Sequence, residues 1–78
     1  MEEKIITLDK VAVGKRAKVV SLSNGGNVCR RLQSVGFVEG TFVNVLHKSP
    51  FGEPTAYFIR GAVIAIRAED AAQVFVFV

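Results

Sequence analysis

The sequence is poor in the residues that build metal and disulfide sites: its 78 residues include one Cys, one His and no Trp. The single cysteine, Cys29, excludes an internal disulfide and a multi-thiolate metal site, and it fits a reducing compartment. The single histidine, His47, falls in the middle of a predicted strand. One His, one Cys and scattered acids do not form a chelating spacing, so we expect no metal site and no cofactor.

Long apolar runs are also missing. Every apolar stretch is interrupted within a few residues, far short of the roughly 18 residues that a transmembrane helix needs. Residues 1–10 carry acids where a secretory signal peptide would carry positive charge. We therefore expect a cytoplasmic chain without a membrane span.

Nothing in the sequence has the arrangement of a catalytic site. The carboxylates Glu39, Glu53, Glu69 and Asp70 fall in predicted loops or turns, and no spacing joins two of them into an acid–base pair. Phosphate-binding motifs of the GxGxxG and GxxxxGK[ST] types do not occur. No catalytic residue is predicted, and we do not expect an enzyme.

Negative charge is missing from one long segment. Residues 10–38 contain six Lys and Arg and no Asp or Glu, whereas the whole chain has a net charge of +3. Such a segment is a solvated face, or it binds a polyanion or an acidic protein surface. A small basic nucleic-acid-binding barrel is therefore an alternative, although the phenylalanines and Tyr57 lie mostly in the second half and are interpreted as core.

What is present is a series of short alternating segments. They predict a mainly β fold, a single domain over residues 1–78, and a small closed five-stranded barrel, since closure removes exposed strand edges. Within strand 41–48, alternation places Val43, Val45 and His47 on one face. The predicted elements are a helical turn at 7–14 capped by Thr7, strand 16–22, helix 27–35 with Asn27 as N-cap, strand 41–48, loop 49–54, strands 55–60 and 62–67, a helical turn at 68–72 and strand 73–78.

The end of the predicted helix is the most informative stretch. Gly36 falls where a left-handed residue ends a helix, and Leu32 and Phe37 then stand at the positions that form the hydrophobic contact of a Schellman motif. Gly40 frees the turn into the next strand, and Gly61 completes a tight turn.

Several short motifs occur in a fixed order from Leu8 to Val78: Leu8 with Gly14, Arg31-Leu32, Gly36-Phe37, Gly40, the loop 49–54, Gly61, Ala65-Ile66-Arg67 and Ala71. Together they resemble the FeoA family, small cytoplasmic proteins of bacterial ferrous iron transport. Glu39 departs from the proline that the family often has before the second glycine, and this touches only a turn.

The resemblance implies an SH3-like barrel and a non-enzymatic accessory role. The implied partner is FeoB, the membrane ferrous iron transporter, bound through its cytoplasmic G-protein domain, so that the chain would associate with the membrane through this partner. The same domain is found in some iron-dependent repressors, which leaves a metal-sensing regulatory domain as a further alternative.

Candidate partner contacts follow from exposure. The predicted helix buries Leu32 and leaves its two arginines in solvent, and loops on a rigid barrel commonly carry function. An apolar content of 50% and a mean hydropathy of +0.36 also fit a docking surface or self-association. The predicted contact residues are Arg30, Arg31, Pro50, Phe51, Gly52, Glu53 and Pro54.

Overall fold

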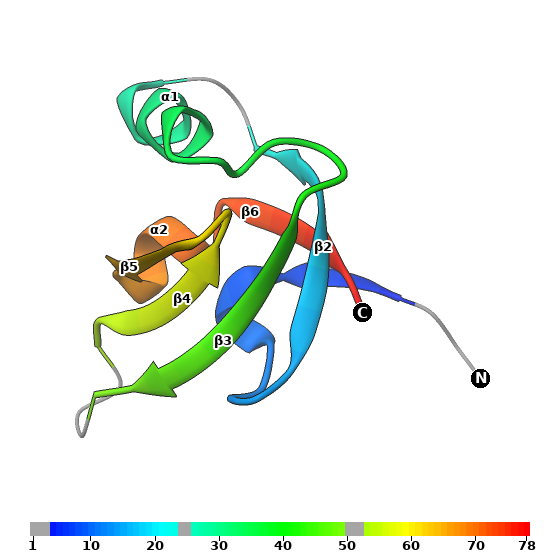
Figure 1. Ribbon diagram of the computed structural model, residues 1–78. Helices are drawn as coiled ribbons and strands as arrows, with labels where there is room; N and C mark the ends of the chain where they lie inside the picture. The colour runs from blue at the N-terminus through cyan, green and yellow to red at the C-terminus, as the bar shows by residue number, and fades with distance from the viewer. Residues whose placement is uncertain (1–3, 24–25, 50–52) are drawn as a thin grey trace.

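The computed structural model describes residues 4–23, 26–49 and 53–78. These residues form one antiparallel sheet with two short α-helices and a 3-10 helix (Figure 1). In chain order the elements are β1 (Ile5–Thr7), the 3-10 helix η1 (Leu8–Lys10), β2 (Arg16–Leu22), α1 (Asn27–Ser34), β3 (Phe42–Lys48), β4 (Thr55–Ile59), β5 (Ala62–Ile66), α2 (Ala68–Ala71) and β6 (Val74–Phe77).

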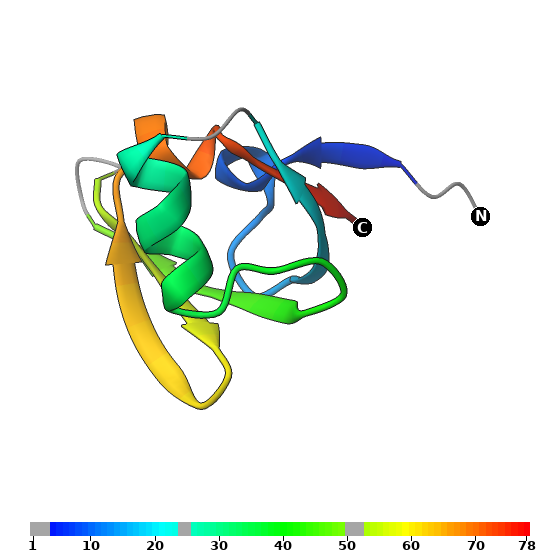
Figure 2. The ribbon, with the colours of Figure 1, turned by 90° about the horizontal axis from the view of Figure 1, so that it is seen from above.

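The strands are ordered β1-β6-β2-β3-β4-β5, and each neighbouring pair is antiparallel. The last strand, β6, lies between β1 and β2, which brings the two ends of the described chain together. The backbone N–H of Val78 donates to the carbonyl of Lys4 at 3.1 Å. Seen from above, α1 lies beside β5 (Figure 2).

The mainly β prediction is confirmed, and the sheet differs from the predicted one in two respects. β1 is an additional strand of three residues, too short for a periodic signal, and its backbone pairs with β6 from Ile5↔Phe77 to Thr7↔Phe75. The sheet is also not closed: its end strands, β1 and β5, are not paired with each other among the described residues. The free edge of β5 faces α1 instead of another strand.

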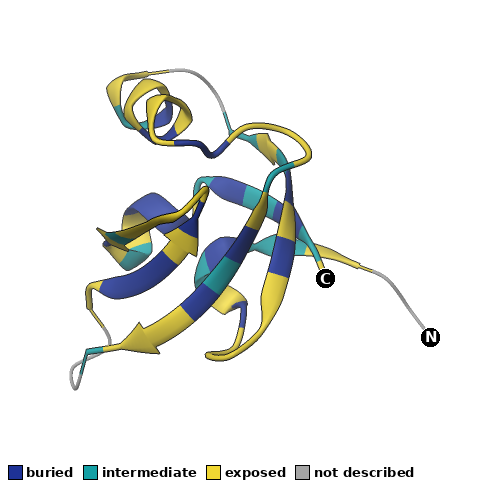
Figure 3. Ribbon diagram, in the orientation of Figure 1, coloured by how far each residue is buried: buried dark blue, intermediate teal, exposed yellow. Residues whose placement is uncertain are grey.

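Strand alternation builds the core inside this curved sheet (Figure 3). Inward positions on neighbouring strands carry apolar residues, and α1 contributes Leu32, which is 4% exposed. The cluster of buried residues is Leu8, Val11, Ala17, Val19, Leu32, Phe37, Val43, Val45, Tyr57, Ile59, Ile66, Ala71, Val74 and Val76.

Two predicted placements in the sheet are wrong. A β-bulge between Val45 and His47 shifts the register against β4, so Val45 is buried whereas His47 is exposed. The prediction of an aromatic core holds for Tyr57, which is 1% exposed, but for only one of the phenylalanines that the structure describes. Phe37 is fully buried, but Phe42 and Phe58 are 49% and 39% exposed, because they occupy the outward positions of their strands.

Of the two predicted helix caps, one is wrong and one is confirmed in position only. α1 begins at Asn27 and its N-cap is Gly26, whose φ of +136° suits a residue without Cβ. Thr7 is the N-cap residue of η1, as predicted, but its side chain makes no capping hydrogen bond.

Candidate functional site

The end of α1 is fixed by backbone hydrogen bonds that turn the chain sharply. The N–H of Phe37 donates to the carbonyl of Leu32 at 3.0 Å, and the N–H of Gly36 donates to the carbonyl of Gln33 at 3.1 Å. These are the two bonds of a Schellman motif, and Gly36 has a φ of +122°. Leu32 and Phe37 are both buried, so the motif clamps the end of α1 against the sheet.

The start of α1 is held by a different contact. Cys29 is buried, and its Sγ donates to the carbonyl of Ser23 at 2.8 Å. Ser23 in turn donates its hydroxyl to the side chain of Gln73, 2.9 Å away, just before β6. Both ends of α1 are therefore tied to the sheet, which gives its exposed face a defined position.

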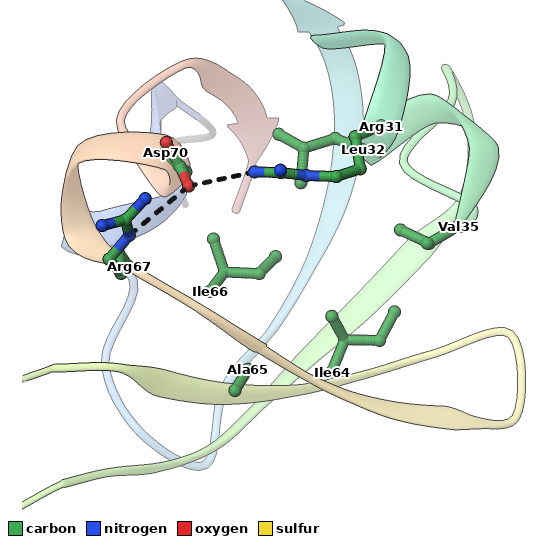
Figure 4. Close-up of a pocket in the computed structure, with 8 residues that line it drawn as sticks. All are labelled: Arg31, Leu32, Val35, Ile64, Ala65, Ile66, Arg67 and Asp70. Carbon is green, nitrogen blue, oxygen red and sulfur yellow. Dashed lines mark ion pairs between the residues drawn. The ribbon is translucent and has the colours of Figure 1, made fainter. Parts of the chain in front are cut away.

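A groove lies between α1, β5 and the start of α2 (Figure 4). Its volume is about 260 Å³, and it is open to solvent. Figure 4 shows Ile64 and Ile66 pointing from β5 into the groove, whereas Ala65 points away from it. The lining residues are Arg31, Leu32, Val35, Ile64, Ala65, Ile66, Arg67 and Asp70.

One end of the groove is charged. Asp70 is 8% exposed, and its Oδ2 lies 3.7 Å from Nη2 of Arg31 and 4.0 Å from Nε of Arg67. The two arginine side chains remain 66% and 65% exposed. Because two guanidinium groups share one carboxylate, the lining residues at this end carry a net positive charge and keep unused N–H donors.

The structure separates the predicted contact residues. Arg31 lines the groove, whereas Arg30 is exposed and is not among the lining residues. Glu53 is engaged within the chain: its Oε1 accepts the N–H of Ala68 at 2.7 Å, at the start of α2. Pro54 is exposed. The predicted contacts Pro50, Phe51 and Gly52 lie outside the described residues.

Sequence reasoning missed the β5 and α2 side of the groove. In the sequence, Ile64 and Ile66 show only the alternation of a strand, and Asp70 is one acid in a predicted turn. Only the tertiary structure brings these residues next to α1. The only available signal was the apolar strand 62–66, which carries no charge or proline to protect an edge.

In the folded chain, aromatic rings lie beside basic residues of segment 10–38, which the sequence alone did not indicate. On the outer face of the sheet, Lys18 pairs with Phe42 on β3 and with Phe77 on β6. The guanidinium carbon of Arg16 lies 4.4 Å from the centre of the Phe42 ring, and Nζ of Lys18 lies 5.9 Å from it. These distances are in the range of cation–π contacts.

Within residues 4–23, 26–49 and 53–78, no three His, Cys, Asp or Glu side chains are grouped so that they could hold a metal ion. In the same part of the chain, no helix has the length and apolarity that crossing a membrane requires.

Comparison with known proteins decides the family. Residues 6–77 match the family model described as the FeoA domain. The chain belongs to the FeoA family. The resemblance carried by the Gly36 and Gly40 motifs is thereby confirmed, over nearly the whole sequence.

The solved structures agree with this assignment. A FeoA-like protein from Clostridium acetobutylicum is 30% identical with a TM-score of 0.87, and the match covers 94% of this chain and 85% of that one. The FeoA of Stenotrophomonas maltophilia, solved with zinc and described as a prokaryotic SH3 domain protein, is 31% identical with a TM-score of 0.82. That match covers 91% of this chain and 88% of the other, so the SH3-like fold is confirmed.

A curated relative adds a different kind of information. The Fe(2+) transport protein A/Fe(2+) transporter FeoB fusion protein of Porphyromonas gingivalis is 30% identical over 67 residues, which are 86% of this chain. This chain matches only 8% of the length of that relative. A FeoA domain and a FeoB transporter thus occur there in one polypeptide.

Proposed function

We propose that this FeoA-family chain is a non-catalytic accessory protein of ferrous iron uptake that binds the FeoB transporter from the cytoplasm, through the transporter's G-protein domain. The observation that carries the proposal is the fused relative, in which the two components are parts of one chain. The name of the Stenotrophomonas relative, a possible ferrous iron transport activating factor, points in the same direction.

The groove between α1 and β5 supports a binding role. It combines an apolar lining with exposed cations, which suits a protein segment that carries acidic residues. Its volume of about 260 Å³ is below the usual range of roughly 300–1,000 Å³ for small-molecule sites. This surface therefore suits a protein segment better than a small molecule.

The experiment is recovery of full-length transporter from the native cell with the tagged chain. Arg31→Glu reverses a charge in the groove, and Arg30→Glu, one residue away and outside the groove, is the matched control. We expect Arg31→Glu to reduce recovery at least about tenfold, because like charges across an interface cost several kcal/mol. Arg30→Glu should change recovery by less than about threefold, since charges outside an interface contribute little.

Two outcomes would count against the proposal. Equal losses for the two variants would move the contact out of the groove. If the wild-type chain recovers no transporter, and its deletion leaves ferrous iron uptake intact, the accessory role itself is wrong.

A second candidate function, nucleic-acid binding, gains support from Phe42 between Arg16 and Lys18, because aromatic rings next to cations suit a single strand. Salt-dependent binding of a generic oligonucleotide, weakened by Phe42→Ala, would favour it. An absence of binding at low salt would remove it.

A further inference from the structure

One edge of β5 is left without a strand in the described part of the chain. β5 pairs only with β4, from Ala62↔Ile59 to Ile66↔Thr55, and it ends the sheet. Natural edge strands are commonly protected by proline, lysine, a bulge or inward-pointing charge. β5 reads Ala-Val-Ile-Ala-Ile and has none of the protecting residues. Its free edge is therefore competent to pair with another extended segment.

The hairpin that leads into β5 decides which backbone groups are available. Arg60 and Gly61 both have positive φ, +49° and +83°, as in the two-residue type I′ turn. The residues that flank such a turn form a hydrogen-bonded pair, and the pattern then alternates along the ladder. Val63 and Ala65 accordingly direct their N–H and C=O groups away from β4, toward the free edge.

The groove lies at this free edge. α1 forms the opposite wall with Leu32 and Val35, and Ile64 and Ile66 point into the space between (Figure 4). A segment paired with β5 would thus place alternate side chains against an apolar lining, the arrangement used in β-strand addition. Ala65 borders the groove through its backbone, because its side chain points away.

The charged end of the groove restricts what such a segment can carry. Arg31 and Arg67 share the single carboxylate of Asp70, so a second carboxylate placed there would meet two guanidinium groups with free donors. Arg67 directly follows Ile66, which puts this charge at the carboxyl end of β5.

We infer that the groove binds an extended segment of the transporter's cytoplasmic part, added as a strand to β5, with an aliphatic side chain against Leu32 and Ile64 and an acidic side chain between Arg31 and Arg67. The choice of the transporter rests on the proposed function. The binding mode rests on the strand edge, the groove and the charges.

A second copy of this chain fits the site less well. Pairing β5 with another β5 would bring the second sheet along, and α1 stands across the space that this sheet would need (Figure 2). The described strand offers no carboxylate to the arginines, since β5 is wholly apolar. An acidic segment of another chain satisfies both conditions.

Substitution of Ala65 tests the backbone contact. Ala65→Pro removes the N–H that faces the groove, and proline is tolerated on an edge strand where the N–H faces outward. Ala65→Val is the matched control. Its side chain has as many carbon atoms as that of proline and lies on the same outward side, but the backbone N–H is kept. We expect Ala65→Pro to weaken the affinity for full-length transporter about tenfold, which is the loss typical of one hydrogen bond. Ala65→Val should change this affinity by less than about twofold. Unchanged circular dichroism and melting temperature would show that both variants are folded.

Amide hydrogen exchange separates this inference from the proposed function. Binding of the transporter should slow exchange of the N–H groups of Val63 and Ala65 at least about tenfold, because these two face the free edge. Binding without this protection, or equal affinities for the proline and valine variants, would overturn strand addition and leave the accessory role intact. Absence of any binding by the wild-type chain would overturn both. Protection that appears without transporter and grows with protein concentration would replace the proposed occupant by a second copy.

Discussion

Both the backbone conformation and the surrounding space require a glycine at position 36. Its φ of +122° is rarely adopted by residues with a Cβ, and an added Cβ would lie 2.7 Å from Cδ of Arg60. Gly40 has a φ of +90°, but an added Cβ there meets nothing within 4 Å. The two glycines of this family motif therefore have different physical roles: both permit a turn, and Gly36 also makes room for a side chain from the β4–β5 hairpin.

This difference predicts unequal costs for the same substitution. Gly40→Ala should lower the free energy of unfolding by about 1–2 kcal/mol, the cost of a left-handed conformation for a residue with a Cβ. Gly36→Ala should cost about 1 kcal/mol more, because the stem of Arg60 has to move. Urea denaturation measures both. Arg60→Ala in the Gly36→Ala background should recover the additional loss, and equal losses for the two glycines would contradict the role given to Arg60.

At the scale of elements, the sequence predicted what depends on local periodicity. Local sequence indicated α1 as a helix over residues 27–35, and two-residue alternation indicated five of the strands to within a residue or two of their observed ends. β1, the bulge before His47 and the open edge of β5 were not predictable, because each is set by pairing with residues distant in sequence. The groove was missed for the same reason, since only tertiary structure brings Asp70 to Arg31.

The loop before β4 offers a test at this scale, because Glu53 was predicted as a partner contact and is engaged with α2. Glu53→Ala removes the acceptor for the N–H of Ala68 and should cost about 1 kcal/mol in the free energy of unfolding, as loss of a helix cap does. Glu53→Gln keeps an oxygen acceptor and should cost less. Both are measured by urea denaturation. If Glu53→Ala leaves stability unchanged and lowers recovery of the transporter, Glu53 is a contact residue and not a structural one.

At the scale of the whole molecule, the core contains a large ionisable side chain, that of Tyr57. Tyr57 is 1% exposed and belongs to the group of largest fully buried side chains. Burial raises the pKa of its hydroxyl, and the nearby charge of Asp9 adds to the increase, whereas the hydrogen bond with the Thr55 side chain acts in the opposite direction. The folded protein therefore holds this proton more tightly than the unfolded chain does.

The raised pKa gives overall stability a defined dependence on pH. Below the unfolded pKa of about 10 the tyrosine is protonated in both states, and its contribution is complete. As pH rises beyond that value the unfolded chain releases the proton first, so the free energy of unfolding falls until the folded pKa is passed. Tyr57→Phe removes the group, and at neutral pH it should cost about 1 kcal/mol through loss of the bond with Thr55.

The measurement is urea denaturation of both proteins between about pH 8 and about pH 11. The two proteins differ only at Tyr57, so the difference in unfolding free energy between wild type and Tyr57→Phe isolates this residue. We expect this difference to shrink as pH rises above about 10, because only the wild type has to bury a group that ionises. A difference that stays constant across this range would mean that Tyr57 ionises as readily in the folded protein as in the unfolded chain, and the core would then be less closed than its burial indicates.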